Sequence, residues 1–332
     1  MCAATGVPPD PPPTGRGTVA ELGEFGLIAR ITADRGLPPG TVLGPGDDAA
    51  VLLAADGRVV VSTDVLVEGV HFRLDWSTPH HIGRKAVAAN LADVAAMGAV
   101  PTALLVGLAV PGHTPVATVD SLTAGMRGEA GRAGAGIVGG DVVSSPQLVV
   151  SITALGGLQG RQPVTRSGAR PGDVFGVCGR LGWSAAGLAL LRRGLRSPRA
   201  VVGAHRVPRP PYRAGPQAAA AGATAMIDVS DGLLADAGHL AQASGVGIDI
   251  DSAALPVAGR LIEVAVALGA SGTQVRHWVL TGGEDHALLA CFPADGALPP
   301  GWRGLGVVQQ GSGVTVDGKA YDAHPAGWEH FR

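Results

Sequence analysis

The sequence alternates short β-branched runs with helical patterns, and residues 160–173 interrupt that alternation. This segment combines prolines, glycines and arginines and has no apolar periodicity, which is typical of a junction between domains. A chain of 332 residues is also long enough for two packed domains. We therefore predict an α/β (α+β) protein with an N-terminal domain over residues 19–160 and a C-terminal domain over residues 161–332.

The N-terminal residues 1–18 are proline-rich and contain no cationic region followed by an apolar region, so they do not fit a signal peptide. We expect a disordered tail there. The longest strongly apolar stretch, residues 102–110, is about half the length that a membrane-spanning helix needs. Cys2, Cys178 and Cys291 are far apart and lack the CxxC spacing, which favours a reducing compartment. We expect a cytoplasmic protein without a membrane span.

Local patterns place the motifs discussed below on secondary structure. Apolar residues at helical spacing predict a first helix over residues 21–34 and a buried helix over residues 82–97. Asp56-Gly57 separates two β-branched runs, residues 50–54 and 58–67, and such a pair favours a hairpin turn. We therefore expect those two runs to be the strands of a hairpin.

Charge and aromatic content exclude some partners. The formal net charge is −2 and aromatic residues make up 4% of the chain, so neither a nucleic acid nor an anionic membrane surface is an expected partner. Lys85 and Lys319 are the lysines of the chain, and neither is followed by Ser or Thr as in a Walker A loop. A bound polyphosphate would then have to be neutralised by metal ions, backbone amides and arginine.

Acidic residues gather in five short segments at the ends of predicted strands, beside apolar runs and glycines where a bare carboxylate is costly to bury. The segments are GPGDD (44–48), STD (62–64), GGD (139–141), DVSDG (228–232) and GGED (282–285), and Asp93 adds a carboxylate from a predicted helix. Each segment alone also fits an ordinary turn or helix cap. Together they favour a metal–phosphate site, and oxygen ligands without a His/Cys set indicate Mg²⁺ or Mn²⁺.

Three further residues carry two interpretations each. His71 fits either a turn histidine or a ligand contact seven residues after Asp64. Arg166 fits either a solvated charge in a linker or a partner for phosphate, and its glycine-rich surroundings favour phosphate. Trp328 fits either a packing anchor for the C-terminus or a stacking partner for a heteroaromatic substrate.

A series of motifs in order along the chain makes it resemble the thiamine-monophosphate kinase family. The motifs are GEFGLI, GPGDDAAVL, STDVLVEGVHF, KAVAANLADVAAMGA, GGDVV, TRSGARPGD, IDVSDGLLADAGH, TGGEDHALL and GWEHF. This family is similar to aminoimidazole ribonucleotide synthetases, selenophosphate synthetases and a hydrogenase maturation factor. The chain lacks both the reactive cysteine beside a lysine of the selenium branch and the cysteine-bearing tail of the hydrogenase factor. The thiamine-phosphate branch therefore fits best.

The resemblance implies roles for particular residues. Metal-binding positions of the family match Asp48, Ser62, Thr63, Asp64, Asp93, Asp141, Asp228 and Asp231. Nucleotide-binding positions match Gly140, Asp141, Arg166 and Ser230, and substrate positions match His71, Glu284 and Trp328. The implied fold is the two-domain fold of aminoimidazole ribonucleotide synthetases, in which the N-terminal sheet pairs across a homodimer. An aromatic residue often follows GED in the family, whereas this chain has His286 at that position.

The activity implied by the resemblance is phosphorylation of thiamine monophosphate to thiamine diphosphate with ATP and several Mg²⁺ ions. Because the acceptor is already an ionised phosphate, we expect direct in-line transfer with no nucleophilic side chain. Two alternatives remain open. One is a purine-type synthetase of the same superfamily that activates an amide oxygen with ATP, and the other is a binding protein that senses nucleotides without turnover. Retention of the whole acidic set disfavours the second alternative.

Overall fold

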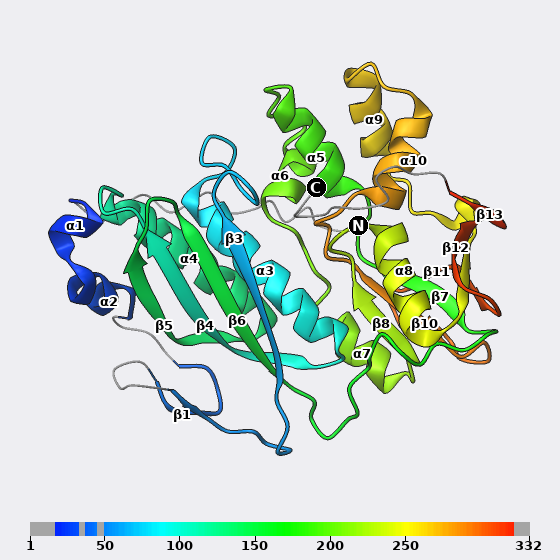
Figure 1. Cartoon of the computed structure of the whole chain (residues 1–332), viewed down its shortest axis with the longest axis horizontal. Helices are drawn as coiled ribbons and strands as arrows, with labels where there is room; N and C mark the ends of the chain where they lie inside the picture. The colour runs from blue at the N-terminus through cyan, green and yellow to red at the C-terminus, as the bar shows by residue number, and fades with distance from the viewer. Residues whose placement is uncertain (1–16, 33–36, 45–49, 322–332) are drawn as a thin grey trace.

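The computed structural model describes residues 17–32, 37–44 and 50–321, and two larger β-sheets in it come from opposite sides of residues 158–173 (Figure 1). The first sheet consists of β3 (Val60–Val67), β4 (Val100–Val110), β5 (Gly136–Ser144) and β6 (Val149–Gly157) in the order β3-β6-β4-β5. β6 pairs antiparallel with β3 and β4, and β4 pairs parallel with β5. The mixture of strands and helices confirms the predicted fold class.

Helices α3 (Pro79–Ala96) and α4 (Val116–Ala133) cover one face of the first sheet (Figure 1). Successive residues of a strand point to opposite faces, and the burial along β3 and β6 follows this period. Leu66 and Ile152 are buried on the helix side, whereas Val61 and Val65 are 60% and 47% exposed on the other. The described residues therefore leave one face of this sheet open, and we call it the open face.

The second sheet has the strand order β13-β12-β9-β11-β7-β10-β8, in which β9 and β12 are parallel and the other neighbours antiparallel. Its strands are β7 (Val174–Cys178), β8 (Ala225–Asp228), β9 (Gly247–Ile250), β10 (Leu288–Phe292), β11 (Arg303–Gln309), β12 (Gly313–Val316) and β13 (Lys319–Ala320). The helices of this half are α5 (Trp183–Arg192), α6 (Arg199–Arg206), α7 (Ala214–Ala220), α8 (Leu233–Ser244), α9 (Gly259–Ala267) and α10 (Gly272–Thr281), with a 3-10 turn at Ser252–Ala254. Across the described ranges, no helix has both the length and the apolar composition needed to cross a bilayer.

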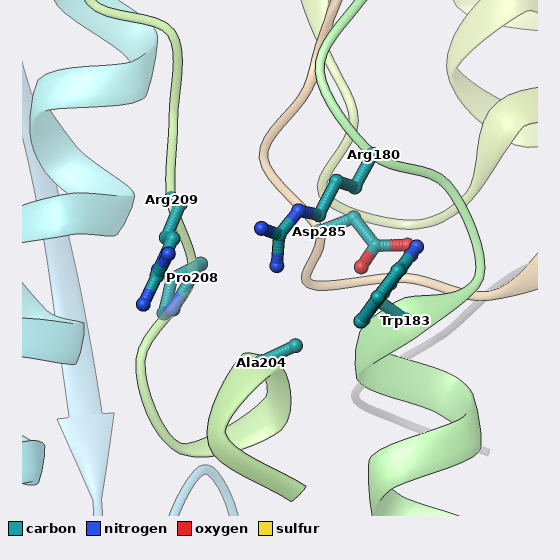
Figure 2. A pocket seen from close by; sticks show the side chains of 6 residues that line it. All are labelled: Arg180, Trp183, Ala204, Pro208, Arg209 and Asp285. Atoms are coloured by element: carbon teal, nitrogen blue, oxygen red, sulfur yellow. The ribbon is translucent and has the colours of Figure 1, made fainter. Parts of the chain in front are cut away.

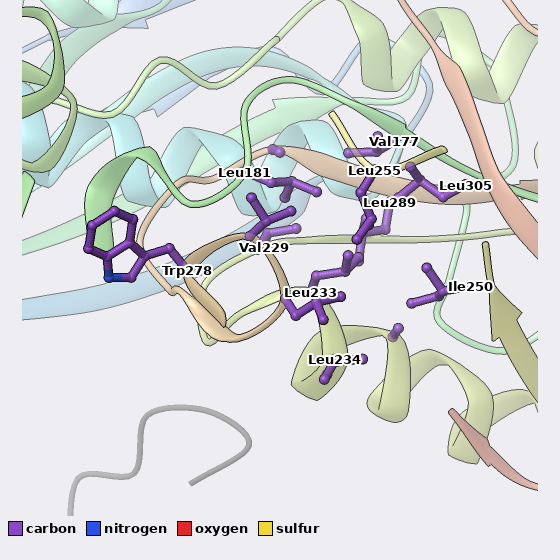
Figure 3. Close-up of a cluster of buried hydrophobic side chains, with 14 of the residues drawn as sticks. Val177, Leu181, Val229, Leu233, Leu234, Ile250, Leu255, Trp278, Leu289 and Leu305 are labelled. Carbon is purple, nitrogen blue, oxygen red and sulfur yellow. The ribbon is translucent and has the colours of Figure 1, made fainter. Parts of the chain in front are cut away.

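Alternate residues of the second sheet enter two different cores. Val177 and Leu289 belong to a large apolar cluster that includes Leu233 of α8 (Figure 3). Their neighbours in the chain, Cys178 and Leu288, belong to a separate cluster that also contains two alanines at the end of α3. This second cluster packs the two halves of the chain against each other, so residues on α3 can meet residues that follow the strands of the second sheet.

Helix α3 is buried along nearly its whole length. Thr78 caps it by accepting a hydrogen bond from the backbone N–H of His81 at 3.3 Å, and Pro79 occupies its first position. A buried helix requires partners for any polar side chain that it carries. Those side chains are His80, His81, Arg84, Lys85, Asn90 and Asp93, all buried or half-buried.

The hairpin predicted around Asp56-Gly57 is wrong. A turn does form, with the Gly57 N–H donating to the Ala54 carbonyl at 3.0 Å. However, β2 (Val51–Leu52) pairs with β1 (Thr41–Leu43), a strand that the sequence did not predict, and β3 pairs with β6. The physical reason is burial, because β3 can place its alternate side chains against α3 only as a member of the first sheet.

The first predicted helix is two helices, α1 (Val19–Leu22) and α2 (Glu24–Thr32), because Gly23 takes a left-handed φ of 74° between them. Thr18 caps α1 in a capping box with Glu21, and the Gly17 carbonyl accepts a hydrogen bond from Val116 N–H at 3.0 Å. Gly17 and Thr18 were assigned to the tail from the sequence, and these contacts make them part of the folded domain. Residues 1–16 lie outside the described residues.

Candidate active site

Three carboxylates from both halves of the chain come together beside α3. Asp64 lies on β3, Asp93 on α3 and Asp228 at the end of β8. Ser62 Oγ donates a hydrogen bond to Asp93 Oδ2 at 2.7 Å, and the backbone N–H of Asp64 donates to Asn90 Oδ1 at 2.9 Å. Ser62 and Asp64 are two residues apart on one strand, so both side chains point to the face that α3 covers. We call Asp64, Asp93 and Asp228 the carboxylate cluster.

The pKa values of two members of the carboxylate cluster, Asp93 and Asp64, are raised. Burial, followed by the charges of Asp228 and Asp64, raises the pKa of Asp93 to about 7. Burial and the charge of Asp228 also raise the pKa of Asp64. Ionising all three groups together therefore costs free energy unless a cation is present. The donor set, carboxylate oxygens with a hydroxyl close by, is the kind that a hard divalent cation prefers, so these residues fit Mg²⁺.

His286 contacts the carboxylate cluster through Asp228. Its Nδ1 lies 2.9 Å from Asp228 Oδ2, and both side chains are buried. Burial lowers the pKa of His286, but the hydrogen bond and the charge of Asp228 outweigh burial and leave that pKa above its ordinary value. A protonated imidazole at this position would balance part of the negative charge of the cluster.

The DVSDG and GGED loops, which include Asp228 and directly precede His286, lie side by side. The Glu284 N–H donates to the Ser230 carbonyl at 2.7 Å, and a Cβ added to Gly283 would lie 2.5 Å from that same oxygen. Glu284 and His286 have left-handed φ values of 62° and 50°. Such backbone is rare for residues other than glycine, and it concentrates at functional sites where the surrounding structure holds it in place.

Asp231 has an acidic environment of its own at the start of α8. Asp236 Oδ2 accepts hydrogen bonds from the backbone N–H groups of Asp231 at 3.0 Å and Gly232 at 2.9 Å. Burial and the nearby charge of Asp228 raise the pKa of Asp236 to about 7. Ligand atoms of Asp231, Asp236 and His239 lie within 4.8 Å of one another. Asp231 thus lies close to a second carboxylate and an imidazole, and this is compatible with the metal role predicted for it.

Two predicted substrate residues, His71 and Glu284, are linked through Lys85. Lys85 Nζ donates a hydrogen bond to the His71 carbonyl at 2.9 Å and forms an ion pair with Glu284 Oε1 at 2.8 Å. The His71 ring is oriented by Nδ1, which accepts a hydrogen bond from the Val67 N–H at 3.0 Å. The other oxygen of Glu284 lies 3.5 Å from His205 Nδ1. The structure therefore brings both predicted substrate residues to a single ammonium group.

A pocket opens next to Asp285 and is lined by Arg180, Trp183, Ala204, Pro208, Arg209 and Asp285 (Figure 2). The buried Asp285 carboxylate accepts hydrogen bonds from the backbone N–H groups of Gly182 and Ser184, and burial raises its pKa to about 7. The guanidinium of Arg180 lies 4.6 Å from the ring centre of Trp183. Asp285 therefore fixes the start of α5 beside the residue, Glu284, that contacts Lys85.

Thr63, Gly140 and Asp141 lie away from the carboxylate cluster. Thr63 is exposed on the open face, opposite to the side chain of Asp64. β5 is three strands from β3, so about 14 Å of sheet separates Gly140 and Asp141 from Asp64. Gly140 also has a structural reason to be glycine, because a Cβ there would lie 2.1 Å from the Val106 carbonyl of β4. The metal and nucleotide roles of these three residues stay predictions.

Arg166 is also separate from the carboxylates. Its side chain is exposed, and its carbonyl accepts a hydrogen bond from Ser244 Oγ, at the end of α8, at 2.9 Å. Arg166 lies beside the start of β8 and Asp228 ends that strand, so about 10 Å separates them. Asp48 and Trp328 lie outside the described residues, and the structure places neither of them.

Lys85, Asn90 and His286 were not predicted as site residues from the sequence. A signal for the first two was present, since both belong to the KAVAANLADVAAMGA motif and Asn90 is one helical turn before Asp93. Polar residues on a helix that is otherwise apolar indicate partners elsewhere in the fold. His286 directly follows GED, but only the contact with Asp228 gives it a role in the site.

Two family models match the chain. The model of the AIR synthase related protein N-terminal domain matches residues 46–158, and that of the C-terminal domain matches residues 170–319. The two matches together cover most of the chain, and the interval between them coincides with the segment that separates the two sheets.

Similar proteins are found among characterised enzymes and solved structures. The thiamine-monophosphate kinase of Mycobacterium tuberculosis is 55% identical over 315 residues, which cover 95% of this chain and 93% of that protein. The thiamine-monophosphate kinase of Corynebacterium glutamicum is 44% identical over 325 residues, covering 95% of each chain. The structure of AaThiL complexed with AMPPCP and TMP superimposes with a TM-score of 0.77 at 34% identity and covers 94% of this chain and 98% of its own.

Proposed function

The chain belongs to the thiamine-monophosphate kinase family, and we propose that it transfers a phosphoryl group from ATP to thiamine monophosphate to form thiamine diphosphate. The observation that carries this proposal is the carboxylate cluster, which both halves of the chain build beside Glu284 and His71. The structure of AaThiL complexed with AMPPCP and TMP supports binding of both a nucleotide and TMP.

Asp64, Asp93 and Asp228 would hold Mg²⁺ in this proposal, with Asp231 as a further ligand. Raised pKa values of Asp93 and Asp64 support it, because a cation would stabilise their ionised forms. When bound, Mg²⁺ would neutralise phosphate charge and align the donor and acceptor phosphates. The remaining metal positions implied by the family resemblance are Asp48, Ser62, Thr63 and Asp141.

No side chain acts as a nucleophile in the proposed reaction. The acceptor oxygen belongs to a phosphate that is ionised at neutral pH, so transfer requires alignment and charge neutralisation more than a strong base. Glu284 and His71, with Trp328, would orient the thiamine part of the acceptor. The nucleotide would contact Ser230, Arg166, Gly140 and Asp141.

A second copy of the chain would cover the open face of the first sheet. Leu105 of β4 and Val143 of β5 are 39% and 51% exposed, and with Val61 and Val65 they extend apolar surface across the sheet. Burying this surface against an identical sheet would stabilise a homodimer. The domain boundaries at residues 19–160 and 161–332 and the cytoplasmic location likewise remain proposals.

The proposal is tested by an acceptor competition. Equal concentrations of thiamine monophosphate, thiamine and AMP are incubated with Mg-ATP, and the products are separated by chromatography. We expect thiamine diphosphate alone, because thiamine brings no phosphate to the metal site and AMP leaves Glu284 and His71 without their partners. Comparable turnover of thiamine would contradict a metal-bridged acceptor, and comparable turnover of AMP would contradict the substrate pocket.

Two further assays separate the proposal from its alternatives. Turnover of formylglycinamidine ribonucleotide would indicate the purine-type synthetase, and nucleotide binding without ADP release would indicate a sensor. Accumulation of a phosphorylated enzyme with ATP alone would contradict direct transfer.

A further inference from the structure

Lys85 connects the two described residues that the family resemblance assigns to the substrate. We infer that Lys85 is a positioning residue, which holds the Glu284 carboxylate as a fixed anion facing the thiamine part of the acceptor and thereby sets the affinity for thiamine monophosphate. The inference rests on the proposed function, because it deepens the role of the same site.

The first argument is the geometry of the ammonium group. Lys85 is 3% exposed, and a buried ammonium group is costly unless it is paired and hydrogen-bonded. Its partners are the His71 carbonyl at 2.9 Å and Glu284 Oε1 at 2.8 Å. His71 follows β3, Lys85 lies on α3 and Glu284 precedes β10, so one side chain links three segments that are distant in the sequence.

The second argument is the charge balance of Glu284. Burial alone would raise the pKa of Glu284, but the charge of Lys85 is the largest opposing cause, and that pKa falls to about 2. Burial and the charge of Lys85 lower the pKa of His205 to about 4, so His205 is neutral at pH 7. Lys85 therefore supplies the positive charge that lies closest to Glu284 and keeps it ionised, whereas the His205 ring, 3.5 Å from the other carboxylate oxygen, is neutral.

The third argument is that the Glu284 carboxylate is partly exposed and can therefore contact a ligand. The Glu284 backbone is held in a left-handed conformation by the Ser230 carbonyl, and its side chain is still 35% exposed. Thiamine offers N–H donors on its aminopyrimidine and a positive charge on its thiazolium, and both are complementary to a carboxylate. A carboxylate with one oxygen fixed by Lys85 loses less freedom when it binds such groups.

A competing explanation is that Lys85 serves only to join the two halves of the chain. The two explanations differ in what they predict for kinetics. A structural link would lower stability and disturb ATP and acceptor binding together, whereas a positioning role raises the KM for thiamine monophosphate selectively and acts only through Glu284.

The test compares Lys85→Met, Lys85→Arg, Glu284→Gln and the double variant Lys85→Met/Glu284→Gln with the wild type. Lys319→Met is the matched control, because Lys319 is the other lysine of the chain and is exposed on β13. KM for thiamine monophosphate, KM for ATP and kcat are measured, with thermal unfolding of every variant. The double variant contains neither charge of the pair, so it keeps the test valid if Lys85→Met alone folds poorly.

We expect Lys85→Met to raise the KM for thiamine monophosphate at least about tenfold, with kcat and the KM for ATP within about threefold of the wild type. Lys85→Arg, which keeps the positive charge, should lie closer to the wild type than Lys85→Met does. In the Glu284→Gln background, adding Lys85→Met should change the acceptor KM by less than about threefold, because the partner through which Lys85 acts is already altered.

An unchanged acceptor KM in Lys85→Met would overturn the inference. So would an equal rise in both KM values, or full additivity of the two substitutions. A wild-type protein that does not turn over thiamine monophosphate would instead refute the proposed function itself, and the inference with it.

Discussion

Helix α3 carries two groups of buried charge that differ in how they are balanced. In the first, Arg84 donates two hydrogen bonds to Glu129 Oε2 at 2.9 and 2.7 Å, and the Tyr212 hydroxyl donates to Glu129 Oε1 at 2.9 Å. We call this group the Arg84–Glu129 cluster. The second is the carboxylate cluster, in which Asp93 meets two other acids and its pKa is raised.

The difference in charge balance suits the Arg84–Glu129 cluster to stabilising the fold and the carboxylate cluster to activity. Glu129 is 0% exposed, yet its charge is matched by Arg84 and both of its oxygens are hydrogen-bonded, so this cluster completes itself within the fold. In the carboxylate cluster, the described residues set three acids against one imidazole, His286, and such an excess of negative charge is typical of a site that binds a cation. Removing a charge should therefore harm the first cluster and relieve the second.

The largest effect is expected from Arg84→Met. This change leaves Glu129 buried without its main cation, and we expect the free energy of unfolding to fall by about 3–5 kcal/mol in a urea titration. Arg260→Met is the control, since the Arg260–Glu263 pair is exposed on both sides and should contribute no measurable stability. If the free energy of unfolding fell as little as it does in the control, the Arg84–Glu129 cluster would not contribute to the stability of the fold.

A smaller effect, of opposite sign for stability, is expected from Asp93→Asn. The substitution keeps the shape but removes a proposed metal ligand, so turnover should fall at least about 10²-fold, or about 2.7 kcal/mol. The free energy of unfolding should stay the same or rise, because repulsion with Asp64 and Asp228 is reduced. Asp120→Asn is the control, since Asp120 pairs with Arg30 away from the cluster and should keep its turnover. Near-normal activity of Asp93→Asn over a full Mg²⁺ titration would remove Asp93 from the metal site.

The pH dependence of stability should distinguish the clusters more finely. The pKa of Asp93 is raised from 3.8 to about 7 in the folded state, so the folded protein binds this proton more tightly than the unfolded chain does. Stability from this group is complete below about pH 4 and is lost as pH rises toward 7. In EDTA, we expect the wild-type Tm to fall by about 4 °C more than that of Asp93→Asn between pH 5 and 7.5. Mg²⁺ should reverse the difference, and equal pH slopes for both proteins would contradict this account.

The smallest effect is expected outside both clusters, at the N-terminus. Residues 1–16 have a proline-rich composition that offers no face to bury, so their deletion should leave kcat and stability unchanged. Deleting residues 1–18 also removes Thr18, which caps α1, and should cost about 1 kcal/mol. Thermal unfolding of the two truncations checks this, and equal behaviour would mean that the Thr18 cap contributes nothing.

Much of the fold was predictable because it depends on local pattern. The apolar spacing of α3, the β-branched run of β3 and the break near residues 160–173 all indicated an α/β chain in two halves. The predictions failed where contacts between residues that are far apart in the sequence determined which strands pair. Asp56-Gly57 has the chemistry of a hairpin turn, but β3 gains more from pairing with β6 over α3 than from pairing with a two-residue strand.

The residues of the candidate site likewise fall into those that the sequence indicated and those that only contacts in the fold revealed. The motifs indicated Asp64, Asp93 and Asp228 as members of one acidic site, and the structure brings them together. The roles of Thr63, Asp141 and Arg166 stay predictions, because the structure places these residues away from the three acids. Lys85 stayed unassigned because its importance comes from the contact with Glu284 across the two halves, and His286 because its importance comes from the contact with Asp228 on β8, also in the second half.

The sequence by itself determined which residue types were available: acids beside glycine-rich turns, scarce lysine, and an apolar helix interrupted by a few polar side chains. Only the tertiary structure decided which of these charges are balanced. Arg84 and Lys85 are neighbours on α3, yet one completes a buried cluster with Glu129 and the other turns to Glu284 in the second half of the chain. The physical reason is that the free energy of a buried charge depends on the groups within a few ångströms of it, and the chain's own order does not specify those groups.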